Sequence, residues 1–67
     1  MERKRLAEFA LERYDNCRRE GLSEKESVRN IIAFVSGAAV VEGEHAKMVA
    51  LMVMTGALDT LRQVANS

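Results

Sequence analysis

The segment Met48–Leu58 constrains this chain more than any other feature, because it is almost entirely apolar. Only Thr55 and Gly56 interrupt its apolar side chains. As a helix, the segment would present apolar side chains around its whole circumference, and such a helix needs burial on every side. The chain must therefore cover this segment either with the rest of its 67 residues or with a second copy of itself.

Helical periodicity and helix-end signals predict three helices, over residues 2–20, 24–41 and 44–65. Gly21 is a natural end for the first, because glycine adopts a positive φ without strain. Ser23 and Glu26 have the spacing of a capping box at the start of the second. The predicted fold class is all-α, with a helical hairpin that follows an N-terminal charged helix. All of it forms a single domain over residues 1–67.

A short β-hairpin is the competing interpretation of residues 31–41. Ile31–Val35 and Val40–Val41 are rich in β-branched side chains, and Ser36 and Gly37 lie between them. The three alanines of this segment favour the helix, because alanine is depleted in strands.

The small size of the chain predicts self-association. A domain near 60 residues buries only about 60% of the surface that its unfolded chain exposes. In a lone three-helix bundle, one pair of side chains on the last helix would face water, either Met48 and Met52 or Leu51 and Leu58. We therefore expect a symmetric helical-bundle homodimer or a higher oligomer. The residues expected to mediate self-association are Ile31, Phe34, Val35, Val49, Met52 and Val53. The alternative is a loosely packed monomer with a methionine-rich surface.

No catalytic or metal-binding constellation stands out. His45 lacks a nucleophile or further ligands at helical spacing, so we expect a solvated residue in the first turn of the last helix. Cys17 lies on the apolar stripe of the first helix and is interpreted as a small buried hydrophobe rather than a reactive thiol. Helical spacing does not bring Tyr14, Cys17 and His45 together. We expect no enzyme, no metal and no cofactor.

Charge and hydropathy argue against nucleic-acid and membrane partners. The formal net charge is zero, and the two later helices lack the basic face of a DNA-reading helix, so we do not expect DNA binding. The most apolar stretches, Ile31–Val41 and Met48–Leu58, are far shorter than the roughly 20 residues that cross a bilayer. No apolar run follows the basic residues 3–5, as a secretory signal requires, so we expect a cytoplasmic protein.

Phe9 is the residue that most suggests a binding role, because it falls on the polar side of the first helix. With Arg5, Glu12 and Arg13 it forms the predicted partner-binding surface. We predict a small non-enzymatic protein–protein interaction module, a homo-oligomeric regulator, adaptor or inhibitor that masks a macromolecular surface. Phage and plasmid regulators are one setting for such proteins. The alternative function is an oligomer that binds an anionic small molecule, such as a nucleotide, at subunit boundaries through Arg18, Arg19 and Arg29.

Overall fold

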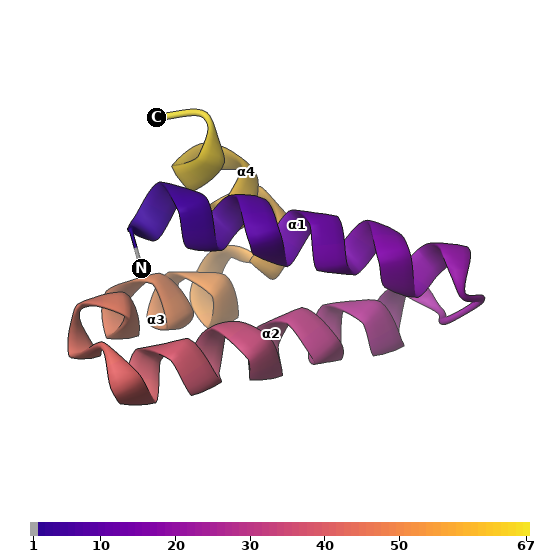
Figure 1. Ribbon diagram of the computed structural model, residues 1–67, viewed down its shortest axis with the longest axis horizontal. Coiled ribbons are helices and arrows are strands. Elements are labelled where there is room, and N and C mark those ends of the chain that lie inside the picture. The colour runs from indigo at the N-terminus through magenta and orange to yellow at the C-terminus, as the bar shows by residue number, and fades with distance from the viewer. Residues whose placement is uncertain (1) are drawn as a thin grey trace.

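The computed structural model describes residues 2–67, except for the side chain of Glu44. These residues form four α-helices and one 3₁₀ turn (Figure 1): α1 (Arg3–Arg19), α2 (Glu24–Val41), η1 (Gly43–His45), α3 (Ala46–Thr55) and α4 (Ala57–Ala65). No strand occurs in the described part of the chain, and α2 runs through the segment for which a β-hairpin was the alternative. The all-α fold class is confirmed, whereas the number of helices differs from the prediction.

The connection between α1 and α2 forms as the sequence predicts. Gly21 adopts a φ of +95°, and the N–H of Leu22 donates to the carbonyl of Cys17 over 3.1 Å, which closes the end of α1. At the start of α2 the Ser23 hydroxyl accepts from the N–H of Glu26 over 3.1 Å and donates to the Glu26 carboxylate over 3.0 Å. Local signals therefore place this turn correctly.

The prediction of one helix over residues 44–65 is wrong, because Gly56 divides it into α3 and α4. Gly56 has φ +106° and ψ 132°, a conformation that side chains with a Cβ rarely adopt. Hydrogen bonds connect the residues on the two sides of this break. The hydroxyls of Thr55 and Thr60 both donate to the carbonyl of Leu51, over 2.7 and 3.2 Å. The N–H of Gly56 also donates to the carbonyl of Met52 over 3.1 Å, so these bonds hold the end of α3 where the backbone turns.

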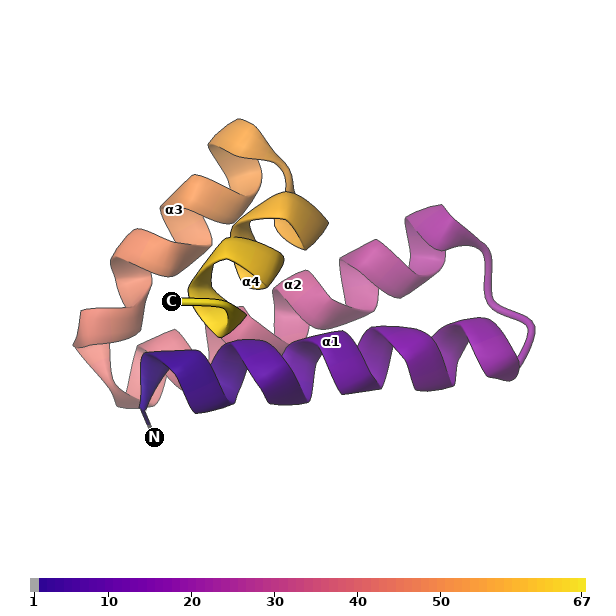
Figure 2. The same ribbon diagram turned by 90° about the horizontal axis from the view of Figure 1, so that it is seen from above.

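The break allows α4 to fold back and pack along α1, while α3 packs against α2 and α4. Figure 2 shows α3 and α4 on the same side of the α1–α2 pair, whose opposite side is uncovered. All four helices contribute to one apolar core. Its buried members are Leu6, Ala7, Ala10, Ile31, Val35, Met48, Met52, Ala57 and Leu61.

A single chain reaches the dimensions of a monomeric domain. Its radius of gyration is 10.9 Å, and a compact chain of this length is expected at about 11 Å. Its accessible surface is 4463 Å², close to the roughly 4200 Å² typical of a monomer of this mass. Met48 and Met52 are 1% and 2% exposed. Of the two pairs that a lone bundle was expected to leave facing water, Met48 and Met52 are therefore covered within one chain, whereas Leu51 is 47% exposed.

The Gly56 break predicts opposite effects for two glycine-to-alanine substitutions. Gly56→Ala should lower the free energy of unfolding by about 1–3 kcal/mol, because alanine is strained at this positive φ although the space for a Cβ is open. Gly37→Ala, inside α2 with no atom within 4 Å of its Cβ, should raise it by about 0.5–1 kcal/mol. Urea unfolding measures both. A stabilising Gly56→Ala would show that α3 and α4 form one helix.

Candidate interaction surfaces

A shallow hollow lies where α1 and α2 pass one another. Its lining comes from α1 through Phe9, Glu12, Arg13 and Asn16 and from α2 through Phe34, and its volume is about 240 Å³. Successive members of the four α1 residues are three, one and three positions apart, so all four lie on one side of the helix. Phe9 is 41% exposed, which makes it a large apolar group that water reaches.

Each phenylalanine of this hollow lies beneath an arginine. The guanidinium carbon of Arg5 is 5.7 Å from the ring centroid of Phe9, and that of Arg13 is 5.2 Å from the ring centroid of Phe34. These distances fall within the range of cation–π attraction. Arg13 also donates from Nε to the side-chain oxygen of Asn30 over 2.6 Å, so α2 orients this side chain at two points. We call Arg5, Phe9, Arg13 and Phe34 the arginine–phenylalanine face.

The structure brings together the residues that the sequence suggested for partner binding. Phe9, Glu12 and Arg13 line one hollow, and Arg5 stacks on the ring of Phe9. Sequence reasoning did not place Phe34 here, because its position beside α1 depends on the register of two antiparallel helices. The only sequence feature that could have indicated this placement is the position of Phe34 at the edge of the apolar face of α2.

Three of the six residues predicted for self-association lie in the core of a single chain. Ile31 and Val35 are fully covered, and Met52 is 2% exposed, so none of them is available to a second copy of this fold. They pack in the core that all four helices share, so a single chain already covers them. Phe34 and Val49 are half-buried. Of the six, only Val53 is largely exposed, at 70%.

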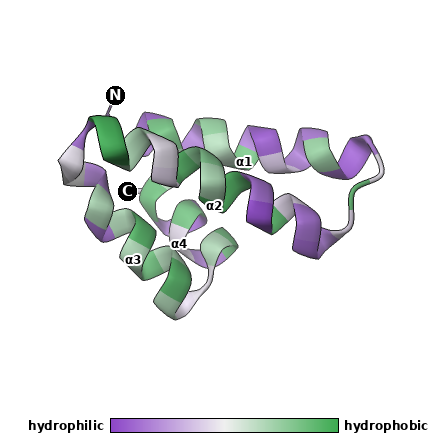
Figure 3. Ribbon diagram, turned by 90° about the horizontal axis from the view of Figure 1, so that it is seen from below, coloured by the Kyte–Doolittle hydropathy of each residue, from purple (hydrophilic) through white to green (hydrophobic). Residues whose placement is uncertain are grey.

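The outer surface of α3 carries apolar side chains that the chain does not cover. We use the name α3 face for Leu51, Val53 and Met54, which are 47%, 70% and 79% exposed. Lys47 is the only charged residue of α3. Figure 3 shows α3 as largely hydrophobic, in contrast to the hydrophilic end of the molecule at the α1–α2 turn. Val40 and Val41, at the end of α2, form a second exposed apolar site.

His45 is buried, which corrects the prediction of a solvated residue. The η1 turn directs its ring toward the core, where 1% of the side chain remains exposed. Its Nε2 lies 3.0 Å from a carboxylate oxygen of Glu42, and its Nδ1 is buried without a hydrogen-bond partner. Residues 2–67, the Glu44 side chain aside, contain no group of three or more potential metal ligands. The Cys17 side chain is 7% exposed, as its place on the apolar stripe predicts.

The three arginines of the predicted anion site do not form a common cavity within one chain. Arg18 donates to the carbonyl of Leu22 over 3.3 Å, and Arg19 donates to the side chain of Asn16 over 3.2 Å. Both bonds remain near the end of α1, where cationic side chains complement the helix dipole. The hollow at this turn is lined by other residues: Arg13, Asn16, Cys17, Glu20, Leu22 and Asn30. Anion binding by Arg18, Arg19 and Arg29 between copies stays a prediction.

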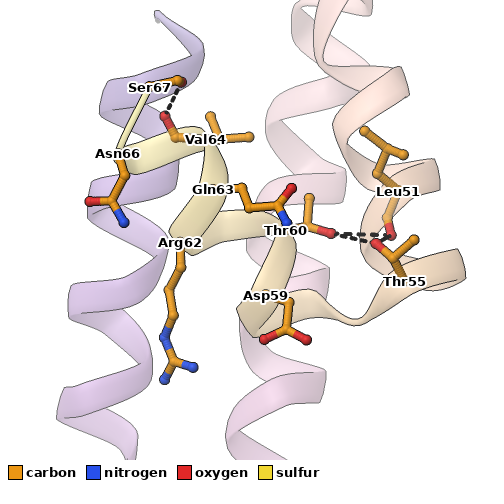
Figure 4. A pocket seen from close by; sticks show the side chains of 9 residues that line it. All are labelled: Leu51, Thr55, Asp59, Thr60, Arg62, Gln63, Val64, Asn66 and Ser67. Atoms are coloured by element: carbon orange, nitrogen blue, oxygen red, sulfur yellow. Dashed lines mark hydrogen bonds between the residues drawn. The ribbon is translucent and has the colours of Figure 1, made fainter.

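A wider hollow of about 750 Å³ lies between α3 and the end of α4. Figure 4 shows that its charged side chains, Asp59 and Arg62, and the amide of Asn66 do not converge on one point. All three side chains are exposed. The threonine hydroxyls nearby already bond to the Leu51 carbonyl and to each other. This hollow therefore lacks the convergent polar groups that orient a small ligand.

Comparison with known proteins finds no match to this chain among family models, curated proteins or solved structures. Within the described residues, no helix combines the length and the apolar character that crossing a membrane requires.

The placement of Ile31 in the core of one chain predicts a destabilisation that does not depend on protein concentration. Ile31→Val should lower the free energy of unfolding by about 0.5–1.5 kcal/mol, because it leaves a methyl-sized void. Denaturation at two concentrations tenfold apart should give the same loss. Val53→Ala, at an exposed position, serves as the control and should change the unfolding of the dilute protein by less than about 0.5 kcal/mol. If the decrease in the free energy of unfolding caused by Ile31→Val varied with protein concentration, Ile31 would lie in an interface between copies.

Proposed function

We propose that the chain is a small non-enzymatic protein–protein interaction module. It acts as a homo-oligomeric regulator, adaptor or inhibitor by masking a macromolecular surface with its arginine–phenylalanine face. The observation that carries this proposal is the pair of cation–π stacks around one hollow, Arg5 on Phe9 and Arg13 on Phe34. Arginine and aromatic residues are enriched at the centres of protein interfaces.

The rigid support of this face favours binding over a role as an ordinary charged surface. Phe9 and Arg13 project from the middle of a helix of 17 residues, and Phe34 projects from one of 18. The α1 helix is held against both α2 and α4. A binding site on packed helices keeps its geometry better than one on loops, so a partner meets side chains that are already in place.

The α3 face supports the homo-oligomeric part of the proposal. Leu51, Val53 and Met54 lie outside the apolar core, and no further element of the described chain covers them. Because α3 carries a single charge, two copies related by a two-fold axis would bring few like charges together. Burial of apolar side chains between copies is favourable in proportion to the area removed from water.

Photo-cross-linking in the native host tests the partner-binding role. A photoreactive phenylalanine analogue in place of Phe9 should give a discrete adduct with a second macromolecule, and Arg13→Glu should abolish that adduct because it reverses the charge over Phe34. The same analogue at Lys25, an exposed residue of α2 outside the hollow, is the control. Identical adducts from both positions, or none from Phe9, would contradict the proposal.

Sedimentation tests the proposed self-association. The wild-type chain should form a dimer or larger species as its concentration rises, and the double substitution Val53→Glu with Met54→Glu should return it to the 7.5 kDa monomer. Buried glutamates without partners would make that contact unfavourable. Phe9→Asp, on α1 and outside the α3 face, should leave the mass unchanged. A wild-type chain that stays monomeric at the highest attainable concentration would rule out the oligomer.

A further inference from the structure

The arginine–phenylalanine face has a repeating pattern along α1 that specifies the chemistry of a partner. Arg5, Phe9 and Arg13 follow one another at intervals of four residues, so they form a row along one side of the helix. Eight residues of α-helix span about 12 Å. The two arginines therefore start from backbone positions about 12 Å apart along the helix axis, with the exposed Phe9 midway between them.

We propose that this face binds an acidic amphipathic helix of another protein, with one carboxylate on Arg5, one on Arg13 and an apolar side chain between them. The inference rests on the proposed function and specifies its partner. A partner helix with the same rise per residue would carry its two carboxylates seven or eight positions apart. Its apolar residue would lie near the midpoint and reach the hollow beside Phe9 and Phe34.

The hydrogen-bonding capacity of the two arginines supports carboxylate recognition. Arg13 uses Nε for Asn30, and its two terminal nitrogens have no partner among the described residues. Within residues 2–67, the only interaction of the Arg5 guanidinium is the contact with the Phe9 ring. A guanidinium with free terminal nitrogens binds a carboxylate through two parallel hydrogen bonds. Stacking on an aromatic ring leaves the edge of the guanidinium open to such a partner.

The size of the hollow favours a side chain over a free small molecule. Its volume of about 240 Å³ lies below the roughly 300–1000 Å³ of pockets that enclose small ligands. Its lining includes two aromatic rings and one carboxylate, that of Glu12. Glu12 repels a carboxylate placed over the middle of the row, so the acidic groups of a partner are confined to the two arginines at its ends.

Charge patterning argues against two other occupants of this face. If a second copy packed its α1 antiparallel about Phe9, Arg5 of each copy would face Arg13 of the other, and two pairs of like charges would meet. A nucleic-acid backbone would place phosphates against Glu12 as well as the arginines, and the whole chain has no net positive charge to attract it. An acidic helix with separated carboxylates avoids both conflicts.

Selection from a displayed library of helical peptides of about 18 residues, long enough for stable helices, tests this inference. Peptides that bind the wild-type chain should carry two Asp or Glu residues seven or eight positions apart with a large apolar residue between them. The same selection against the double variant Arg5→Glu with Arg13→Glu should yield Lys or Arg at those positions. A selection that enriches no peptide, or enriches peptides without the acidic pair, would overturn the inference.

Binding of a resynthesised selected peptide, measured by fluorescence anisotropy, provides the matched comparison. Arg5→Gln and Arg13→Gln should each weaken binding about fivefold or more, a loss that only a minority of interface residues cause. Arg13→Lys should also weaken it, because lysine keeps the charge but loses the two-bond geometry. Arg29→Gln removes an exposed α2 arginine outside the hollow and should leave binding within about twofold, as neutral interface changes do. Equal binding by wild type and Arg13→Gln would contradict the proposed contacts.

The outcomes separate this inference from the proposed function. Peptides that require Phe9, as shown by lost binding with Phe9→Ala, but lack the acidic pair would refute the partner chemistry and leave the interaction module in place. Absence of both Phe9-dependent peptides and cross-links from position 9 would refute the two together.

Discussion

The turn at Gly56 determines how the rest of this chain packs. As one helix, residues 46–65 would be about 30 Å long, nearly the 32 Å length of the whole molecule. Such a helix could lie along only one groove of the α1–α2 pair. With the turn, α3 and α4 approach the pair as two short helices, and Met48, Met52 and Leu61 all reach the same core. Each such side chain contributes about 1.5–3 kcal/mol when it leaves water.

The parts of the fold that the sequence predicts are those that depend on neighbouring residues. Gly21 and the Ser23–Glu26 pair define the α1–α2 turn through contacts within a few positions of themselves. Gly56 escaped prediction because apolar periodicity continues on both sides of it, and a helix tolerates a glycine at a cost of about 1 kcal/mol. The turn forms because burial of α4 against α1 outweighs the hydrogen bonds of a continuous helix, and that contact is distant in sequence.

The difference between local signals and contacts distant in sequence also explains which residues of the candidate surfaces the sequence indicated. Phe9 was identified because its position on the polar side of one helix is a local property, and the structure exposes it. Ile31 and Val35 were placed between copies because a last helix that is apolar all round required more cover than one chain was expected to supply. Phe34 and Asn30 could not be paired with Arg13 from the sequence, since the pairing depends on how α1 and α2 align. Errors in the site therefore follow from the one missed turn and from helix register.

The uncovered surfaces that result differ in the kind of contact they can make. The α3 face is apolar and nearly uncharged, so it gains free energy from burial without strong directional preference. The arginine–phenylalanine face has fixed donors at fixed spacing, and such patterns confer selectivity among partners. The two faces lie on different helices, the arginine–phenylalanine face on α1 and α2 and the α3 face on α3. The proposed partner binding and the proposed self-association therefore rest on separate sets of residues.

Preorganisation offsets the small area that such a face can bury. Ordering a flexible arginine on binding costs about 0.5–1.5 kcal/mol of side-chain entropy. In this fold Arg13 is already held by the Phe34 ring and the Asn30 oxygen, and Arg5 lies against Phe9 before any partner arrives. Contacts within α1 and between α1 and α2 therefore order these side chains during folding, and this part of the entropy cost does not arise on binding. A partner helix therefore retains more of the free energy of its carboxylate contacts, which makes specific recognition by a hollow of this size physically reasonable.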